Sequence, residues 1–437
     1  MRHKFMIFAA ALAAVRAGGV ISADEQFWDF KVQSTYLSQY KPAMRSLYSG
    51  DNSLRAHREK GYTYTTTAYL GVRPWPGAEF YYNYEAVQGL GFSNVQGLGG
   101  ITNGEIQKVA SRQVTFYRPR AYLKQTFGLG GEKQPVESDQ NQLAGQVDKR
   151  RFVFTAGNLA VTDLFDRVEY AGDPRTQFMN WGHLTYNSFD FAADSRGYTY
   201  GVAGELFWDD WVLRAGRFLQ PRESNGLRLN FQWRKSYGDN AEIEHAHTLF
   251  GLPGKLRLLA YRNVAEMGSF ADAIVFQAVN TAPTPAVSNV RRRQAKVGFG
   301  VSIEQRVADG VGVFARLGRH DGKTETYAYA EVDHSFSAGT EVSGRHWGRA
   351  NDTLGVAYMQ NNLSQSHRTY LAAGGLGFFI GDGALNYAPE HVFETYYSAA
   401  VQKAFWISLG YQRIQNPAYN RDRGPVNVMS VRFHTEF

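Results

Sequence analysis

The sequence predicts an all-β protein, a transmembrane antiparallel β-barrel, and three observations support this fold class. Segments that alternate apolar and polar residues recur along most of the chain, with polar turns between them. The chain contains 26 Tyr, 29 Phe and 8 Trp, yet its mean hydropathy is −0.39. Beyond residue 23 no run of apolar residues is long enough for a membrane-spanning helix, which excludes a helical membrane protein. An aromatic-rich chain that is polar overall is expected when strands face lipid on one side and water on the other.

The first 23 residues have the pattern of a secretory signal peptide. Arg2 and Lys4 precede an apolar run from Phe5 to Val15, and small residues follow. The apolar run is too short to cross a bilayer as a helix, which takes about 20 residues. We therefore expect cleavage near Ala23, and a single barrel domain formed by residues 24–437.

The period of two places successive side chains on opposite faces, which is the geometry of a strand. About eighteen segments have this pattern, each close to the length that a tilted strand needs to cross a bilayer. They are residues 31–40, 62–72, 79–86, 114–123, 151–157, 198–207, 211–219, 227–233, 241–250, 255–264, 295–306, 311–319, 325–333, 340–347, 352–360, 392–402, 405–414 and 429–437. Many turns between them are short, whereas other connections are long, as in outer-membrane barrels.

The last of these segments has an apolar face that extends to the end of the chain. Phe437, Phe433 and Met429 lie on this face, and the opposite face is charged and polar. Chain ends usually fray unless they are tied down. We therefore expect Phe437 to face lipid and to act as a signal for the barrel assembly machinery of the outer membrane.

Two connections are longer than most structureless loops, and such loops usually have a function. One runs from Val87 to Gln113. The other runs from Leu159 to Gly197 and carries both signs of charge and several aromatic residues, namely Asp163, Asp166, Arg167, Glu169, Asp173, Arg175, Phe178, Trp181, Tyr186, Asp194 and Arg196. We expect the second loop to fold into the barrel lumen and narrow it; a solvated external loop is the alternative.

Several fragments of the sequence resemble the carbohydrate-selective porins of the OprB family. They are DPRTQFMNW (173–181), ADSRGYTYG (193–201), ESNGLRL (223–229), AAGGLGFFIGDGALNY (372–387) and, most specifically, NPAYNRDRGPV (416–426) before a strand that ends in Phe. The resemblance implies an outer-membrane barrel of the porin type in a Gram-negative cell, through which glucose and related small sugars diffuse passively. It also implies sixteen strands, which we favour over the eighteen counted from the alternation.

A sugar pore needs groups that exchange hydrogen bonds with a neutral hexose weakly enough to release it. Two sets of residues at a spacing of two supply such groups, and each set shares a strand face. The sets are Glu79, Asn83 and Glu85 on one strand, and Arg118, Arg120 and Tyr122 on another. We expect both to face the lumen, because Tyr117, Ala121 and Leu123 make the opposite face of the second strand mainly apolar.

A general or anion-preferring porin is the main alternative, since several arginines could form a ladder that attracts anions: Arg118, Arg120, Arg214, Arg217 and Arg228. The acidic residues named above argue for a lumen of mixed charge instead. The sequence shows no Ser-His pairing that would indicate an enzyme. His245 and His247 could bind a metal only with a third ligand, and the sequence suggests none. We expect no catalytic residues, metal or cofactor. The formal net charge of +7, which falls on loss of the signal peptide, is too small to indicate nucleic acid, so the expected partners besides sugar are outer-membrane lipid and lipopolysaccharide.

Overall fold

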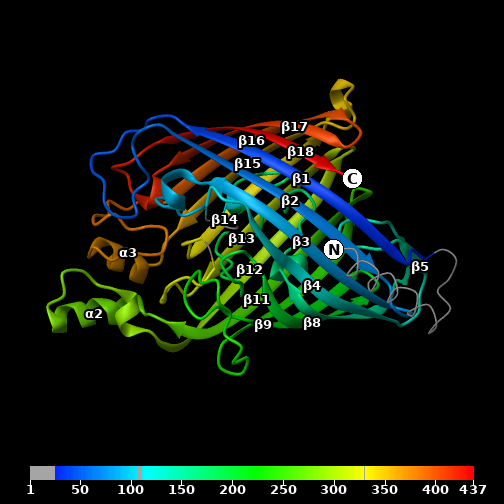
Figure 1. Ribbon diagram of the computed structural model, residues 1–437, viewed down its shortest axis with the longest axis horizontal. Coiled ribbons are helices and arrows are strands. Elements are labelled where there is room, and N and C mark those ends of the chain that lie inside the picture. The colour runs from blue at the N-terminus through cyan, green and yellow to red at the C-terminus, as the bar shows by residue number, and fades with distance from the viewer. Residues whose placement is uncertain (1–24, 107–110, 329) are drawn as a thin grey trace.

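The computed structural model describes residues 25–106, 111–328 and 330–437, and these form a closed antiparallel β-barrel (Figure 1). Within the described residues sixteen strands make up the barrel, and β1 closes it by pairing with β18. The sixteen strands favoured above are therefore confirmed, and the count of eighteen is wrong. The predicted signal peptide, residues 1–23, lies outside the described residues.

The barrel strands follow one another around the wall in chain order. They are β1 (Trp28–Lys41), β2 (Glu59–Val72), β3 (Ala78–Leu90), β4 (Thr115–Gly128), β7 (Arg151–Leu159), β8 (Thr199–Trp208), β9 (Trp211–Leu219), β10 (Tyr237–Leu249), β11 (Leu252–Met267), β12 (Arg292–Ala308), β13 (Val311–His320), β14 (His334–Ser343), β15 (Thr353–Asn362), β16 (Glu390–Gln402), β17 (Phe405–Gln415) and β18 (Val426–Glu436). Two further strands, β5 (Lys133–Val136) and β6 (Gly145–Asp148), form a separate hairpin, and α2 (Phe270–Asn280) and α3 (Gln365–Ala372) lie in loops. None of the helices in the described ranges combines the length and apolarity needed to span a bilayer.

The strands alternate between a lipid-facing and a lumen-facing side, as β18 illustrates. Met429 and Phe433 are exposed on the outer side, whereas Arg432 and His434 are buried on the inner side. The terminal Phe437 continues the outer face and is 77% exposed. Its amide donates to the carbonyl of Val32 at 2.8 Å, and its carbonyl accepts from the Val32 amide at 3.0 Å, so β1 ties down the end of the chain.

Short turns join the strands at one end of the barrel, and long loops join them at the other, where α2 and α3 also lie (Figure 1). Bacterial outer-membrane barrels have short turns on the periplasmic side and long loops outside the cell, which assigns the two ends. One connection departs from this rule. Residues 129–150, between β4 and β7, carry the β5–β6 hairpin at the periplasmic end.

Two of the predicted strands are absent from the part of the chain that the structure describes, and a third is displaced. Residues 227–233 lie in the loop between β9 and β10, and 325–333 lie in the loop between β13 and β14. The backbone of this second loop has other partners, because the amides of Tyr327 and Ala328 donate to the carboxylate of Asp190 at 2.9 and 2.6 Å. The strand expected at 340–347 is instead β14, which begins and ends earlier, since residues from Gly344 form a short 3-10 turn.

Candidate pore constriction

The connection between β7 and β8, residues 160–198, lies inside the barrel and is called the constriction loop below. Buried arginines of the wall hold its backbone. Arg432 of β18 donates to the carbonyl oxygens of Pro174 at 2.9 Å and Gln177 at 2.7 Å. Arg316 of β13 donates to the carbonyl oxygen of Ala171 at 2.7 Å. Both arginines are at most 2% exposed, so their hydrogen bonds are satisfied largely by the loop.

Carboxylates also fix the constriction loop to the wall. Glu394 of β16, which is fully buried, accepts hydrogen bonds from the amides of Met179 at 2.6 Å and Asn180 at 3.1 Å. Within the loop, the Asp166 carboxylate pairs with Arg316 at 2.9 Å and its side chain is fully buried. Asp166, which the sequence predicts to line the pore, uses its carboxylate to hold the loop to the wall, and the residue also borders the cavity described below.

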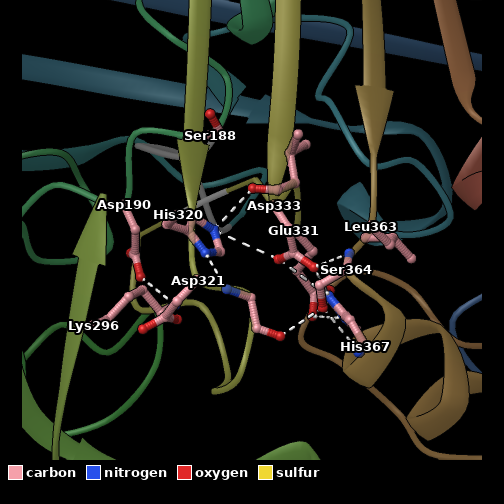
Figure 2. A network of polar contacts seen from close by, with 12 residues as sticks. Ser188, Asp190, Lys296, His320, Asp321, Glu331, Asp333, Leu363, Ser364 and His367 are labelled. Carbon is pink, nitrogen blue, oxygen red and sulfur yellow. Dashed lines mark hydrogen bonds and ion pairs between the residues drawn. The ribbon is translucent and has the colours of Figure 1, made fainter. Parts of the chain in front are cut away.

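A further anchor connects the constriction loop to the extracellular loops, and Figure 2 shows it from close by. Asp190 of the constriction loop forms an ion pair of 2.7 Å with the buried Lys296 of β12. Nearby, Asp333 accepts a hydrogen bond from the Ser364 amide at 2.7 Å and lies 3.2 Å from Nδ1 of His367 at the start of α3. Glu331 accepts hydrogen bonds from the amides of Phe379 and Ile380 in the same network, which joins three separate loops at the mouth of the channel.

His320 at the end of β13 completes the network in a neutral form. Its Nδ1 accepts a hydrogen bond from the Gly322 amide at 3.0 Å, which requires that this nitrogen carry no proton. Its Nε2 lies 3.0 Å from the carbonyl oxygen of Val332, to which it therefore donates. The main partner of the Asp333 carboxylate is therefore His367. Burial alone would raise the pKa of the Asp333 carboxyl, but His367 holds this pKa well below its usual range.

The second long loop, singled out in the sequence between Val87 and Gln113, also enters the barrel. The amides of Gly99 and Gly100 donate to the buried carboxylate of Glu390 on β16, at 2.9 and 3.0 Å. Further along, the Trp181 amide of the constriction loop donates to the carbonyl oxygen of Ile101 at 2.8 Å. The two loops therefore pack against each other inside the wall and together reduce the open cross-section.

Between these loops and the wall lies a cavity of about 700 Å³. Arg120 of β4 donates two hydrogen bonds to Asp163 of the constriction loop, at 2.7 and 2.6 Å. Arg175 of the same loop pairs with Glu85 of β3 at 2.7 Å and with Glu105 of the second loop at 2.9 Å. Burial alone would raise the pKa of the Asp163 carboxyl, but Arg120 holds it below its usual value, so both members of this pair are charged at neutral pH.

Aromatic rings lie beside these charge pairs. The Tyr198 ring centre is 5.2 Å from the Arg120 guanidinium carbon, and the Tyr117 ring centre is 4.5 Å from that of Arg196. Trp181 and Tyr69 also line the cavity. The site therefore offers fixed hydrogen-bonding groups of both charges next to flat apolar surfaces.

The structure brings many of the sequence-predicted site residues to this cavity. Those that line it are Arg120, Asp163, Asp166, Arg167, Glu169, Asp173, Arg175, Trp181 and Arg196. Glu85 lies behind Arg175 and is 1% exposed, and Asn83 is fully buried in the wall. Asp194 accepts the amides of Arg196 and Tyr198 and shapes the end of the constriction loop.

The remaining predicted residues lie elsewhere in the barrel. Glu79 pairs with Arg73 at 2.9 Å and with Lys124 at 3.1 Å, towards the periplasmic end of β3. Tyr122 does face inwards, and its ring lies 5.3 Å from that of Tyr81.

The prediction that Arg118 faces the lumen is wrong. The pairing of β3 with β4 shifts between Asn83, opposite Arg120, and Glu85, opposite Tyr117, so β4 contains a bulge. Tyr117 therefore points inwards and donates to Glu85, whereas Arg118 points outwards and donates to the hydroxyl of Tyr200 at the exposed surface. Pro119 explains the bulge, because proline has no amide to donate to the strand ladder and is found in strands mainly at edges and bulges.

The arginine ladder expected of an anion-preferring pore is also absent from the described residues. Arg214 is matched by the carboxylates of Glu205, Glu242 and Glu244 at 2.8, 2.9 and 3.0 Å. Arg217 pairs with Asp239 at 2.6 Å, and Arg228 is exposed in the loop between β9 and β10. The wall is thus a network of mixed charge, which does not favour the alternative.

Sequence reasoning missed several residues that line the cavity, namely Tyr69, Glu105, Asp139, Gln140, Asn141, Tyr198 and Glu436. Tyr69 lies on the polar face of β2, and Glu105 lies in a loop already singled out for its length, so both carried a signal. Asp139, Gln140 and Asn141 belong to the β5–β6 hairpin, where no alternation marks the strands.

Comparison with known proteins identifies the family. The family model described as "Carbohydrate-selective porin, OprB family" matches residues 71–437. This chain belongs to the OprB family. It is accordingly a carbohydrate-selective channel of the Gram-negative outer membrane, as the sequence resemblance implied.

Solved structures agree with this barrel fold. The chain is similar to the high-pH structure of OprB from Pseudomonas putida, with 17% sequence identity, a TM-score of 0.70 and 94% of each chain covered. It is also similar to the outer membrane channel DcaP of Acinetobacter baumannii, with 10% identity, a TM-score of 0.52, and 96% of this chain and 100% of that chain covered. No curated protein sequence matches the chain.

Proposed function

We propose that this OprB-family channel selects small neutral sugars such as glucose where the Arg120–Asp163 and Arg175–Glu105 pairs face the cavity. The observation that carries the proposal is the two-bond contact of Arg120, on the wall, with Asp163, on the constriction loop. Each pair presents donors and acceptors at fixed positions while its charges largely cancel. A sugar hydroxyl can therefore exchange its hydrogen bonds with water, one at a time, for hydrogen bonds with these pairs. Because the charges largely cancel, the pairs do not create a strong electric field that would retain ions.

Flat side chains complete this proposed sugar path. Tyr198, Tyr69 and Trp181 line the same cavity, and their rings suit the C–H faces of a hexose. The cavity volume of about 700 Å³ is of the size that holds a small ligand. The chain acts in this proposal as a passive channel that carries no catalytic residues.

Liposome swelling with a series of sugars tests the proposal directly. Purified channel should admit glucose faster than a disaccharide, and glucose should reduce the ion current through single channels in a planar bilayer. A general porin would instead admit both sugars at rates set by size alone, with no glucose block, and a reversal potential measured in a salt gradient would report its ion preference.

We further propose that lipopolysaccharide contacts the extracellular end of β4 and β8. Arg118 contacts Tyr200, whose ring lies beside Phe231, and the exposed residues that follow Phe231 in the chain include Trp233, Arg234 and Lys235, which supports this. The Tyr200 and Phe231 ring centres are 5.7 Å apart, and Phe231 and Trp233 are 67% and 52% exposed. Cations suit lipid phosphates, and aromatic rings suit the membrane interface. Loss of copurifying lipopolysaccharide in an R234S/K235S variant, quantified by mass spectrometry, would support this; unchanged lipid content would contradict it.

Two other proposals concern biogenesis of the channel. Residues 1–23 act as a cleaved export signal before a single barrel domain of residues 24–437, and N-terminal sequencing of the outer-membrane form tests this. Phe437 acts as the signal read by the barrel assembly machinery, supported by its exposure at the end of a paired strand.

A further inference from the structure

The β5–β6 hairpin is the exceptional periplasmic connection of this barrel, because the other turns at that end are short. Its two strands pair from Lys133 opposite Asp148 to Val136 opposite Gly145. The tip between them, residues 137–144, is rich in carboxylate and amide side chains: Glu137, Asp139, Gln140, Asn141 and Gln142. Such a polar hairpin could project into the periplasm, but its contacts place it elsewhere.

The tip lies against the inner wall of the barrel, far around the circumference from the strands that bear it. Gln140 donates through Nε2 to Oε1 of Gln33 on β1 at 2.6 Å, and to Oε1 of Glu436 at the end of β18 at 3.3 Å. The Leu143 amide donates to the Tyr81 hydroxyl on β3 at 3.1 Å, and Leu143 is 1% exposed. The hairpin therefore leaves β4 and crosses the inner faces of β3, β2 and β1 as far as β18.

The base of the tip is also held. The Ala144 amide donates to Oε1 of Gln26 at 2.8 Å, and the Ala144 carbonyl accepts from the Gln26 amide at 3.0 Å. Arg73, in the turn after β2, donates to the same carbonyl at 3.3 Å and pairs with Glu79 at 2.9 Å. These contacts make the hairpin a fixed part of the periplasmic mouth.

The tip borders the path that a solute takes after the constriction. Asp139, Gln140 and Asn141 line the same cavity of about 700 Å³ as Arg120 and Asp163. The opposite side of the hairpin, through Val136, Gln142 and Val147, lines a second cavity of about 470 Å³ on the side of β8–β12. The hairpin therefore lies between two parts of the lumen and narrows the exit from the constriction.

We propose that the β5–β6 hairpin forms a second selective layer on the periplasmic side, a polar exit subsite in which Asp139, Gln140 and Asn141 bind the hydroxyls of a neutral monosaccharide. Both donors of the Gln140 amide nitrogen go to Gln33 and Glu436, so its Oε1 is left to accept, as do the oxygens of the Asp139 carboxylate. The Asn141 amide nitrogen donates, and the three side chains can therefore satisfy adjacent hydroxyls of one sugar ring. The proposal rests on the proposed sugar selectivity of the constriction. It extends that function by giving the released sugar a second partner before it reaches the periplasm.

Cysteine chemistry tests the position of the tip, because the chain contains no cysteine of its own. The D139C channel is labelled with a neutral, hexose-sized methanethiosulfonate reagent, and mass spectrometry measures the extent of labelling. Labelling should lower single-channel conductance and glucose influx by about twofold or more, since permeation is limited at the narrowest part of a pore. The matched control is Q134C, which is on the exposed outer part of the hairpin and lines neither cavity. Full labelling of D139C with unchanged conductance would overturn the proposal.

Sugar recognition by the tip is tested separately from pore size. The D139N/N141A variant removes a charge and an amide without adding bulk, and it should weaken the glucose block of ion current by about threefold, as expected for loss of hydrogen bonds to a sugar. Heat-modifiable gel mobility confirms that the barrel has folded. A folded variant with unaltered glucose block would overturn the subsite. If glucose block is unchanged in R120Q/D163N but weaker in D139N/N141A, the constriction proposal fails and the exit subsite is supported. If glucose block is weaker in R120Q/D163N but unchanged in D139N/N141A, the exit subsite fails and the constriction proposal is supported.

Discussion

The guanidinium of Arg120 on β4 and the carboxylate of Asp163 in the constriction loop are joined by two hydrogen bonds, of 2.7 and 2.6 Å. The contact connects the barrel wall to the segment that narrows it, and both residues line the same cavity. Such two-bond pairs are geometrically specific, so each side chain has a fixed orientation towards a passing solute. In the proposed sugar path, the position of the constriction loop and the contact with solute therefore both depend on this pair.

Replacement of Arg120 by glutamine should weaken the glucose block of the ion current much more than replacement of Arg118. R120Q keeps a hydrogen-bonding group but loses the charge, and we expect glucose block of the ion current to weaken by about 1 kcal/mol in binding free energy. R118Q is the matched control, because Arg118 points to the outer surface two residues away on the same strand. Equal losses in both variants would contradict the bulge at Pro119, and no loss in either would contradict sugar contact at Arg120.

Arg432 should hold the constriction loop in place. R432M removes the donors to the carbonyl oxygens of Pro174 and Gln177, and leaves these part-buried acceptors without that partner. Such losses cost roughly 1–3 kcal/mol for each buried group. We expect a noisier open channel and a lower temperature of heat modification in gels.

The control for this variant is R345M, because Arg345 pairs with Asp309 in an exposed periplasmic turn. Surface ion pairs contribute little, so R345M should behave as wild type. If R432M conducts as quietly as R345M, the loop does not depend on Arg432.

Asp333 should stabilise the extracellular loops at neutral pH, and this stabilisation should decrease in acid. Burial alone would raise the pKa of the Asp333 carboxyl, but its contact with His367 holds this pKa well below the usual range, so the contribution of Asp333 is present at neutral pH. Because the folded pKa is lower than that of the unfolded chain, this contribution shrinks as the pH falls below about 4. The D333N variant should therefore melt at a lower temperature than wild type at pH 7, with a smaller difference under acidic conditions.

Thermal melts followed by circular dichroism across this pH range measure the difference. D272N is a useful comparison, since Asp272 pairs with Arg292 at a partly exposed position near the same mouth. A D333N deficit that stays constant with pH would show that Asp333 acts through packing alone.

Deletion of Phe437 should reduce barrel assembly. The residue ends the outer face of β18, and its backbone pairs with Val32 of β1 where the barrel closes. We expect less heat-modifiable barrel in outer-membrane fractions, with the missing protein recovered from the periplasm. F437Y keeps an aromatic terminus and should assemble normally; normal amounts of the deletion variant would remove the proposed signal.

The alternation of residues determined the barrel and its lipid-facing surface. In β18 the alternation from Met429 to Phe433 can be recognised without knowing the neighbouring strands, because it follows from the geometry of a single extended chain. The two long loops were likewise evident from their length and charge. What alternation alone could not show is whether a segment finds a neighbouring strand, and residues 325–333 alternate well but give their amides to Asp190.

Tertiary structure decided which of the polar residues meet in the pore. Arg118 and Arg120 are equivalent in a regular strand, and only the shifted pairing of β4 with β3 turns one outwards and the other inwards. The sequence does not distinguish the hairpin tip from a solvated turn, whereas the structure places Gln140 against Gln33 and Glu436, on the first and last strands of the barrel. Local sequence determines on which face of its own strand a side chain lies. Register and long-range hydrogen bonds depend on partners that are distant in the sequence, and these become neighbours only when the barrel closes.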